Sequence, residues 1–148
     1  MSDALKLVYT DTFEHAFDEK GRLTVPREWR GDGFETRLYV MPPEPGCLKV
    51  YPGSWLGEKM RALAGAAIDD PRRKSFERLA AQIQGVELDR QHRITVRERL
   101  RAAAQLGRNA VLTGRFDHFE IWSREKWRGD AGQLGALTVD SVLREAGL

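Results

Sequence analysis

The sequence has little of what several classes of protein depend on. Its single cysteine, Cys47, excludes both an intrachain disulfide and a cysteine-rich zinc site. No run of apolar residues approaches the roughly 20 that a membrane-spanning helix needs. Residues 1–10 are too polar and too short for the apolar core, about 7–15 residues, of a signal peptide. We therefore expect a cytoplasmic protein that has no membrane partner.

Charge of one sign is also scarce. The 24 basic and 22 acidic side chains leave a formal net charge of +2, which excludes a diffuse polycationic binder. Any surface for nucleic acid must therefore come from local clusters of basic residues. Hydrophobic residues make up 41% of the 148 positions and charged residues 31%, as in an ordinary folded domain rather than a disordered segment.

Motifs of common catalytic sites are missing as well. The sequence has no Gly-x-x-x-x-Gly-Lys phosphate loop, no Gly-x-Ser-x-Gly turn and no His-Glu-x-x-His metal motif. The histidines His15, His92 and His118 lack the close i, i+3 or i, i+4 spacing of a helical metal site. We therefore predict that the protein is not an enzyme and uses no metal, other cofactor or small-molecule substrate.

What the chain does contain is an internal similarity at one fixed spacing. The segment DEKGRLTV at 18–25 resembles DRQHRITV at 89–96, which lies 71 positions later. The same spacing carries LKVY at 48–51 onto FEIW at 119–122. Two separate matches at one spacing indicate a duplication, and such a repeat decides how the fold is assigned. We call residues 9–55 the first half and residues 85–127 the second half.

Each half predicts the same order of elements: strand, turn, strand, short helix, strand, strand. Phe13, His15 and Phe17 alternate with polar residues as in a half-buried strand, and Lys20–Gly21 forms a tight turn. Leu23–Val25 is then expected to close a hairpin. Further elements of the first half are a short helix over 26–29 and strands over 37–41 and 47–51. In the second half the strands cover 86–88, 94–96, 110–113 and 118–122, with a turn at 90–92 and a helix over 97–105 that ends at Gly107.

Two helices are expected between the halves, over residues 56–84. The first should be capped by Ser54, and the second should begin with Asp70 as cap and Pro71 as first residue. Their apolar faces are formed at helical spacing by Leu56, Met60, Leu63 and Ala67, and by Phe76, Leu79, Ala80 and Ile83. Residues 128–148 form a tail, in which Thr138 is expected to cap one last helix over 138–146.

The motifs together resemble the MraZ family. Asp-x-Lys-Gly-Arg-Leu-x-x-Pro at 18–26, the helical pair, Asp-x-x-x-Arg-Ile at 89–94 and Phe-Glu-Ile-Trp at 119–122 carry this resemblance over roughly residues 9–128. It implies a mainly β, α+β fold in which two tandem AbrB-like half-motifs of one chain form a swapped-hairpin β-barrel. It also implies a ring-shaped homo-oligomer that regulates transcription at the promoter of the division and cell-wall gene cluster. We expect a repressor associated with the nucleoid.

Two hairpin tips carry the chemistry for binding double-stranded DNA: the first tip, residues 18–22, and the second tip, residues 89–93. Arginine pairs with guanine O6 and N7 or with phosphate, whereas lysine more often contacts phosphate. The resemblance therefore assigns DNA contacts to Lys20, Arg22 and Arg93 first, followed by Arg90 and Gln91. The residues expected to shape the turns and orient the arginines are Asp18, Gly21, Asp89 and His92.

Other interpretations of these residues stay open. Each Asp-x-x-x-Arg pair could serve only to stabilise its turn, because most surface ion pairs bind nothing. The basic run Arg72–Lys74 is more typical of a solvated helix face. An AbrB-type antitoxin would carry one half-motif and a disordered acidic tail, but here Asp130, Asp140 and Glu145 stand beside Arg144. A non-specific architectural DNA-binding protein is distinguished only by its binding to scrambled DNA. A ring with many tips predicts tandem short repeats as the target, since avidity multiplies weak contacts.

Overall fold

A computed structural model of the protein describes residues 8–128 and 138–148. The expectation for residues 1–10 therefore falls almost wholly outside the described residues, as does that for Asp130. The fold is mixed α+β, as expected from the sequence, and its strands pair antiparallel. The described strands are β1 (Thr12–Ala16), β2 (Arg22–Thr24), β3 (Arg37–Val40), β4 (Cys47–Pro52), β5 (Gln84–Glu87), β6 (Arg93–Thr95), β7 (Asn109–Gly114) and β8 (Phe119–Ser123). The described helices are the 3-10 helix η2 (Arg27–Trp29) and the α-helices α1 (Gly53–Leu63), α2 (Pro71–Ala80), α3 (Glu98–Ala103) and α5 (Val139–Glu145).

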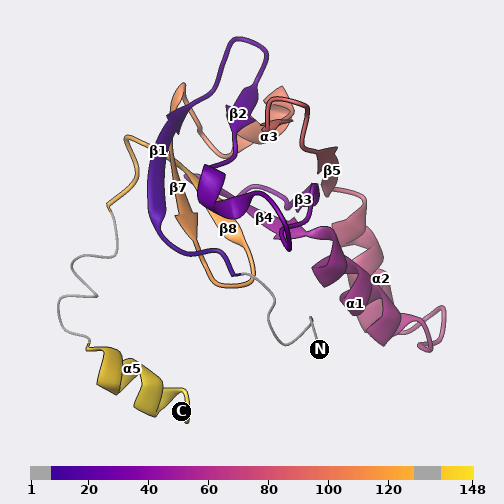
Figure 1. The fold of residues 1–148 in the computed structure, drawn as a ribbon. Coiled ribbons are helices and arrows are strands. Elements are labelled where there is room, and N and C mark those ends of the chain that lie inside the picture. The colour runs from indigo at the N-terminus through magenta and orange to yellow at the C-terminus, as the bar shows by residue number, and fades with distance from the viewer. Residues whose placement is uncertain (1–7, 129–137) are drawn as a thin grey trace.

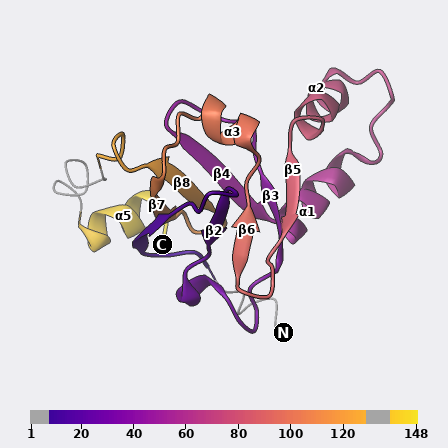
Figure 2. The same cartoon turned by 90° about the horizontal axis from the view of Figure 1, so that it is seen from above.

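The two halves exchange strands. In the six-stranded sheet the order is β1-β7-β8-β4-β3-β5, so β1 of the first half pairs with β7 of the second, and β5 of the second pairs with β3 of the first. Strand β2 (Figure 1) pairs with β6 (Figure 2) in a separate two-stranded sheet. In the register of this sheet Leu23 lies opposite Ile94. Each half therefore completes the sheets of the other.

The hairpin expected within the first half does not extend beyond its turn. The backbone amide of Asp18 donates to the carbonyl of Arg22 at 2.9 Å, but β1 then pairs with β7 and β2 with β6. The reason is burial, because an isolated two-stranded hairpin is marginally stable in water. Leu23 and Phe17 instead join a core to which both halves contribute.

That core lies where the two sheets meet. Leu23 and Ile94 are fully buried at the β2–β6 ladder, and Trp29 of η2 stacks against Phe119 of β8 with ring centroids 4.9 Å apart. The indole Nε1 of Trp29 donates to the carbonyl of Thr10 at 2.8 Å, which satisfies its one polar atom. At roughly 25 cal/mol per Å² of apolar surface, such fully buried side chains supply most of the stabilisation.

The helices between the halves differ in detail from the expectation. Helix α1 begins at Gly53 after Pro52, and Ser54 lies inside it, bonded through its amide to Glu35 at 2.8 Å. Of the expected face of α1, Leu56 is buried whereas Met60 is 58% exposed. Helix α1 ends at Leu63, so Ala67 lies outside it. Helical spacing located the helix, but it does not show whether anything covers each face.

Two expected caps, Asp70 and Thr138, are confirmed, whereas those expected at Ser54 and Gly107 are wrong. The Asp70 carboxylate accepts from the amide of Arg72 at the start of α2, and the Thr138 hydroxyl accepts from Ser141 at the start of α5. Helix α2 has no buried residue and projects with α1 away from the sheets (Figure 1). At the end of α3, Gln105, not Gly107, adopts the left-handed backbone, with φ of 61°. No helix in the described ranges is both long and apolar enough to span a bilayer.

Candidate nucleic-acid interface

The first tip is organised by the carboxylate of Asp18. One of its oxygens, Oδ1, accepts from the backbone amides of Lys20 at 2.9 Å and Arg22 at 2.8 Å. The other oxygen accepts from Nε of the Arg22 side chain at 2.5 Å. Gly21 completes the turn with a φ of 77°, and its amide donates to the Asp18 carbonyl at 3.1 Å. The carboxylate thus fixes both the turn and the direction of the arginine.

The second tip repeats this geometry with different residues. The Asp89 carboxylate accepts from the amides of Gln91 at 2.8 Å and Arg93 at 2.9 Å, and from Arg93 Nε at 3.0 Å. His92 occupies the glycine position with a φ of 65°, and its amide donates to the Asp89 carbonyl at 2.9 Å. Histidine is among the residues that adopt positive φ more readily than most, which accounts for the preserved turn.

These contacts keep both carboxylates ionised. Hydrogen bonds from the backbone amide of Arg22, then from its side chain and from Lys20, lower the pKa of Asp18. The amide of Arg93, then that of Gln91, lowers the pKa of Asp89 in the same way. An ionised carboxylate accepts charge-assisted bonds from a guanidinium and limits its rotation, which reduces the entropy lost when the arginine binds a ligand.

The two tips meet across the β2–β6 ladder. Arg93 lies opposite Thr24, and its Nη1 is 3.8 Å from the Asp18 carboxylate of the other half. The side chains of Arg22 and Arg93 are 31% and 24% exposed. Asp18 therefore stands beside both arginines assigned first from the sequence, and the strand exchange brings both arginines into one composite site.

The remaining residues assigned to the tips divide by exposure. Lys20, Arg90, Gln91 and His92 are exposed, whereas Gly21 is buried. The basic run Arg72–Lys74 lies on α2, apart from the tips. There Arg72 pairs with Asp70 and Arg73 with Glu77. These pairs agree with a solvated helix face. The structure thus places the exposed residues where a ligand can reach them.

Sequence reasoning missed Arg101, which supports the first tip from the second half. Its Nε donates to the Val96 carbonyl at 2.9 Å, and its guanidinium carbon lies 5.8 Å from the ring centroid of Phe17. It also lies so close to Gly21 that a Cβ built there would be 2.7 Å from Arg101 Nη2. At the 71-residue spacing of the sequence Arg101 aligns with Arg30, but this alignment does not indicate that Arg101 contacts the first tip.

A second polar cluster lies around His118, which the sequence did not single out beyond excluding a helical metal site. His118 Nδ1 is 2.7 Å from Asp117 and its ring stacks on Tyr51, with centroids 4.3 Å apart. Burial alone would lower the pKa of His118, but the carboxylates of Glu120 and Asp117 outweigh it and raise that pKa. Burial opposes ionisation of Glu120 too, yet bonds from His118, Trp122 and Arg115 lower its pKa to about 2.

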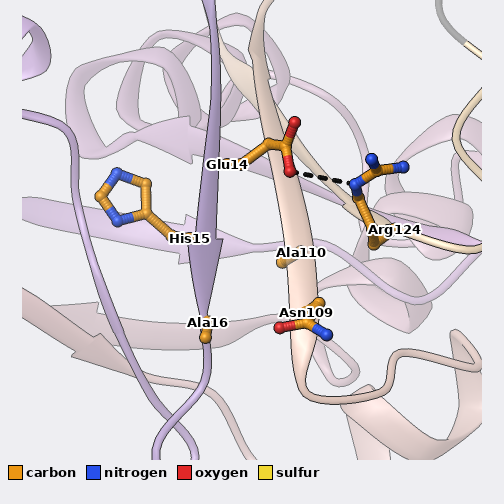
Figure 3. A pocket seen from close by; sticks show the side chains of 6 residues that line it. All are labelled: Glu14, His15, Ala16, Asn109, Ala110 and Arg124. Atoms are coloured by element: carbon orange, nitrogen blue, oxygen red, sulfur yellow. Dashed lines mark hydrogen bonds and ion pairs between the residues drawn. The ribbon is translucent and has the colours of Figure 1, made fainter.

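A shallow hollow also lies along β1 and β7, with a cavity volume of about 400 Å³. Glu14 pairs across it with Arg124 at 3.0 Å, and Asn109 lies beside them (Figure 3). His15 points to the other side of β1, so it does not face this ion pair (Figure 3). The hollow therefore gathers no nucleophile with a base. Among the described residues, no group of three or more His, Cys, Asp or Glu side chains is placed to hold a metal ion.

Comparison with known proteins gives one family. A family model described as "MraZ protein, putative antitoxin-like" matches residues 79–134. A transcriptional regulator MraZ from Thermomicrobium roseum is 38% identical over 133 residues, covering 87% of this chain and 91% of that protein. Proteins of the same name from Roseiflexus castenholzii and Rhodococcus jostii are 32% and 34% identical. They cover 87% and 82% of this chain, and 90% and 85% of their own lengths.

Proposed function

We propose, from the premise that this chain belongs to the MraZ family, that it is a sequence-specific DNA-binding transcriptional regulator. Its two tips contact double-stranded DNA at a promoter, and we propose the promoter of the division and cell-wall gene cluster, where it acts as a repressor at the nucleoid. The observation that carries this proposal is the matched geometry of Asp18–Arg22 and Asp89–Arg93. Two turns that orient an arginine in the same way, side by side, present two guanidinium groups from one site.

The fold supports a division of the chain into repeats. We propose that residues 9–55 and 85–127 are two AbrB-like half-motifs that form a swapped-hairpin β-barrel, with residues 56–84 as linker and 128–148 as tail. The exchange of β1 and β5 between the halves supports this arrangement. A shared core holds the two tips in a fixed relative position, which sequence recognition requires.

In this proposal some residues of the tips contact phosphate and others contact bases. Lys20 and Arg90 are exposed cations suited to phosphate contacts, which set position without reading sequence. Arg22 and Arg93 are oriented through Nε by their aspartates. Their terminal nitrogens then suit the paired acceptors O6 and N7 of guanine in the major groove. Gln91, which is exposed next to these arginines in the second tip, contacts adenine in this proposal.

The low net charge of one chain is the reason to propose that several chains bind DNA together. With a formal net charge of +2, one protomer gains only a modest salt-dependent term from phosphate contacts. A ring-shaped homo-oligomer on tandem short repeats makes later contacts intramolecular, which raises avidity by about 10²–10⁴. An isolated repeat should therefore bind much more weakly than several in tandem.

The test is binding to the region upstream of the chain's own gene, with scrambled DNA as control, at several salt concentrations. Arg22→Ala and Arg93→Ala should each abolish most of the preference for the native DNA while the variants stay folded. Arg72→Ala is the matched control, because Arg72 pairs with Asp70 on α2 away from the tips. It should bind like the unmodified protein. Affinity should fall as salt rises, by roughly 0.9 in log–log slope for each phosphate neutralised.

Each other result has a definite meaning. Equal binding of native and scrambled DNA would leave a non-specific architectural role. Absence of DNA binding by the folded oligomer at low salt would refute the proposal. An AbrB-type antitoxin would then be the remaining interpretation, and its toxin partner should be sought by co-purification.

A further inference from the structure

The two tips carry different residues, Gly21 and His92, at one equivalent position of the turn. Gly21 and His92 both adopt positive φ, 77° and 65°, and each turn is closed by the same bond to its aspartate. Their carbonyls also make matching contacts across the ladder. The Gly21 carbonyl accepts from the amide of Val96, and the His92 carbonyl accepts from the amide of Val25, both at 2.9 Å. The difference therefore lies in the side chain, not in the path of the backbone.

At the first tip there is no space for a side chain. A Cβ on Gly21 would lie 2.7 Å from Arg101 Nη2 and 2.9 Å from the Val96 carbonyl. The Val96 carbonyl belongs to the backbone directly after β6, so it cannot move aside as a flexible side chain can. The first tip thus presents a bare peptide at this position, covered by an arginine of the other half.

At the second tip the corresponding residue is a histidine, and it is exposed. The residue 71 positions before Arg101 is Arg30, and its Nε is buried without a hydrogen-bond partner among the described residues. Arg101 Nε, by contrast, donates to Val96. Arg30 Nε therefore makes no bond among the described residues that would match the one from Arg101 Nε. His92 itself lies between Gln91 and Arg93.

We propose that His92 is a specificity-determining DNA contact, so that the second tip reads a base that the first tip does not. The inference rests on the proposed function and deepens it. Imidazole carries two ring nitrogens, one a donor and the other an acceptor when neutral. Held on a rigid turn next to Gln91 and an oriented Arg93, it suits a base edge better than a mobile side chain would.

The test is His92→Gly, which copies the first tip and keeps the positive φ without strain. We expect this variant to fold, to lose about tenfold in affinity for native DNA, and to keep its affinity for scrambled DNA, since a base contact adds only to specific binding. The slope of affinity against salt should stay the same, because no phosphate contact is lost. Gln105→Gly is the matched control: Gln105 is another exposed residue with positive φ, at the end of α3, and its replacement should leave DNA binding unchanged.

The outcomes separate this inference from the proposed function. If His92→Gly binds native DNA as well as the unmodified protein while Arg93→Ala does not, His92 has no role in recognition and the proposed function stands. If His92→Gly weakens native and scrambled DNA alike, His92 contacts phosphate and the specificity role is wrong. If the unmodified protein does not distinguish the two DNAs, both proposals fail. Should His92→Gly alter the fold, His92→Ala, which also removes both ring nitrogens, gives the same comparison.

Discussion

Gly21 offers the sharpest test of how the two halves support the first tip. We predict that Gly21→Ala lowers the free energy of unfolding by about 2–4 kcal/mol. Its φ of 77° lies in the left-handed region, where an alanine costs roughly 1–2 kcal/mol. The new Cβ would also lie 2.7 Å from Arg101 Nη2, which must move and weaken its bond to Val96, worth about 0.5–1.5 kcal/mol. Crowding against the Val96 carbonyl, at 2.9 Å, adds the remainder.

A matched glycine separates the backbone term from the contacts. Gly31 has a φ of 99°, and a Cβ there would meet nothing within 4 Å. Gly31→Ala should therefore cost only the left-handed penalty, roughly 1–2 kcal/mol. The difference between the two alanine variants then measures what Arg101 and Val96 contribute at the first tip.

The assay is urea unfolding followed by tryptophan fluorescence, with every variant at the same protein concentration so that the free energies of unfolding are compared under equal conditions. Arg101→Ala and the double variant Gly21→Ala/Arg101→Ala complete a double-mutant cycle. The double variant should be less destabilised than the two single effects together, because one clash is removed. It should not recover fully, because the Val96 carbonyl and the strained φ remain. If Gly21→Ala costs no more than Gly31→Ala, the proposed support of the tip by the second half is wrong.

Two further predictions concern the core and the His118 cluster. Leu23→Ala, at a fully buried position of the β2–β6 ladder, should lower the free energy of unfolding by about 2–5 kcal/mol. Leu143→Ala on the exposed face of α5 is its control and should change the free energy of unfolding by less than about 0.5 kcal/mol. Equal effects of the two variants in urea unfolding would contradict the shared core. Glu120 and Asp117 raise the pKa of His118. The stabilisation of the folded protein by these contacts is therefore fully present below the ordinary histidine pKa of 6.5, and it is lost as pH rises through the raised pKa. His118→Gln should therefore destabilise the protein more at acidic than at alkaline pH, and a constant difference across that range would show that folding does not raise the pKa of His118.

The strands and turns could be predicted from the sequence because their signals are local. Alternation marked β1, and glycine or histidine flanked by Asp and Arg marked both turns. Strand pairing could not be predicted in the same way. Phe13 faces Leu112 and Leu23 faces Ile94, partners about 100 and 70 positions away, and periodicity carries no information about such partners. A nearby strand in sequence was therefore taken as the partner of β2, although the partner is β6.

The candidate site shows the same limit. The bonds from Asp18 to Arg22 follow from four-residue spacing, and so do those from Asp89 to Arg93. The approach of Arg93 to Asp18 and the contact of Arg101 with Gly21 depend on how the halves pair, so they appear only once the ladder is known. The helices α1 and α2 illustrate a different limit. Their apolar spacing is helical, but α2 buries none of its residues within the described part of this chain.

The exchanged contacts explain why both tips belong to one folding unit. The carbonyl of Gly21 is satisfied by Val96 of the second half, and the carbonyl of His92 by Val25 of the first. A lone half would leave both turns without these partners, and it would also expose the apolar faces of Leu23 and Ile94 to water. Because each half holds the tip of the other, the relative position of Arg22 and Arg93 is set by the core and not by the flexibility of either loop. The two tips thus differ in residue, as Gly21 and His92 do, while the geometry that joins them is kept.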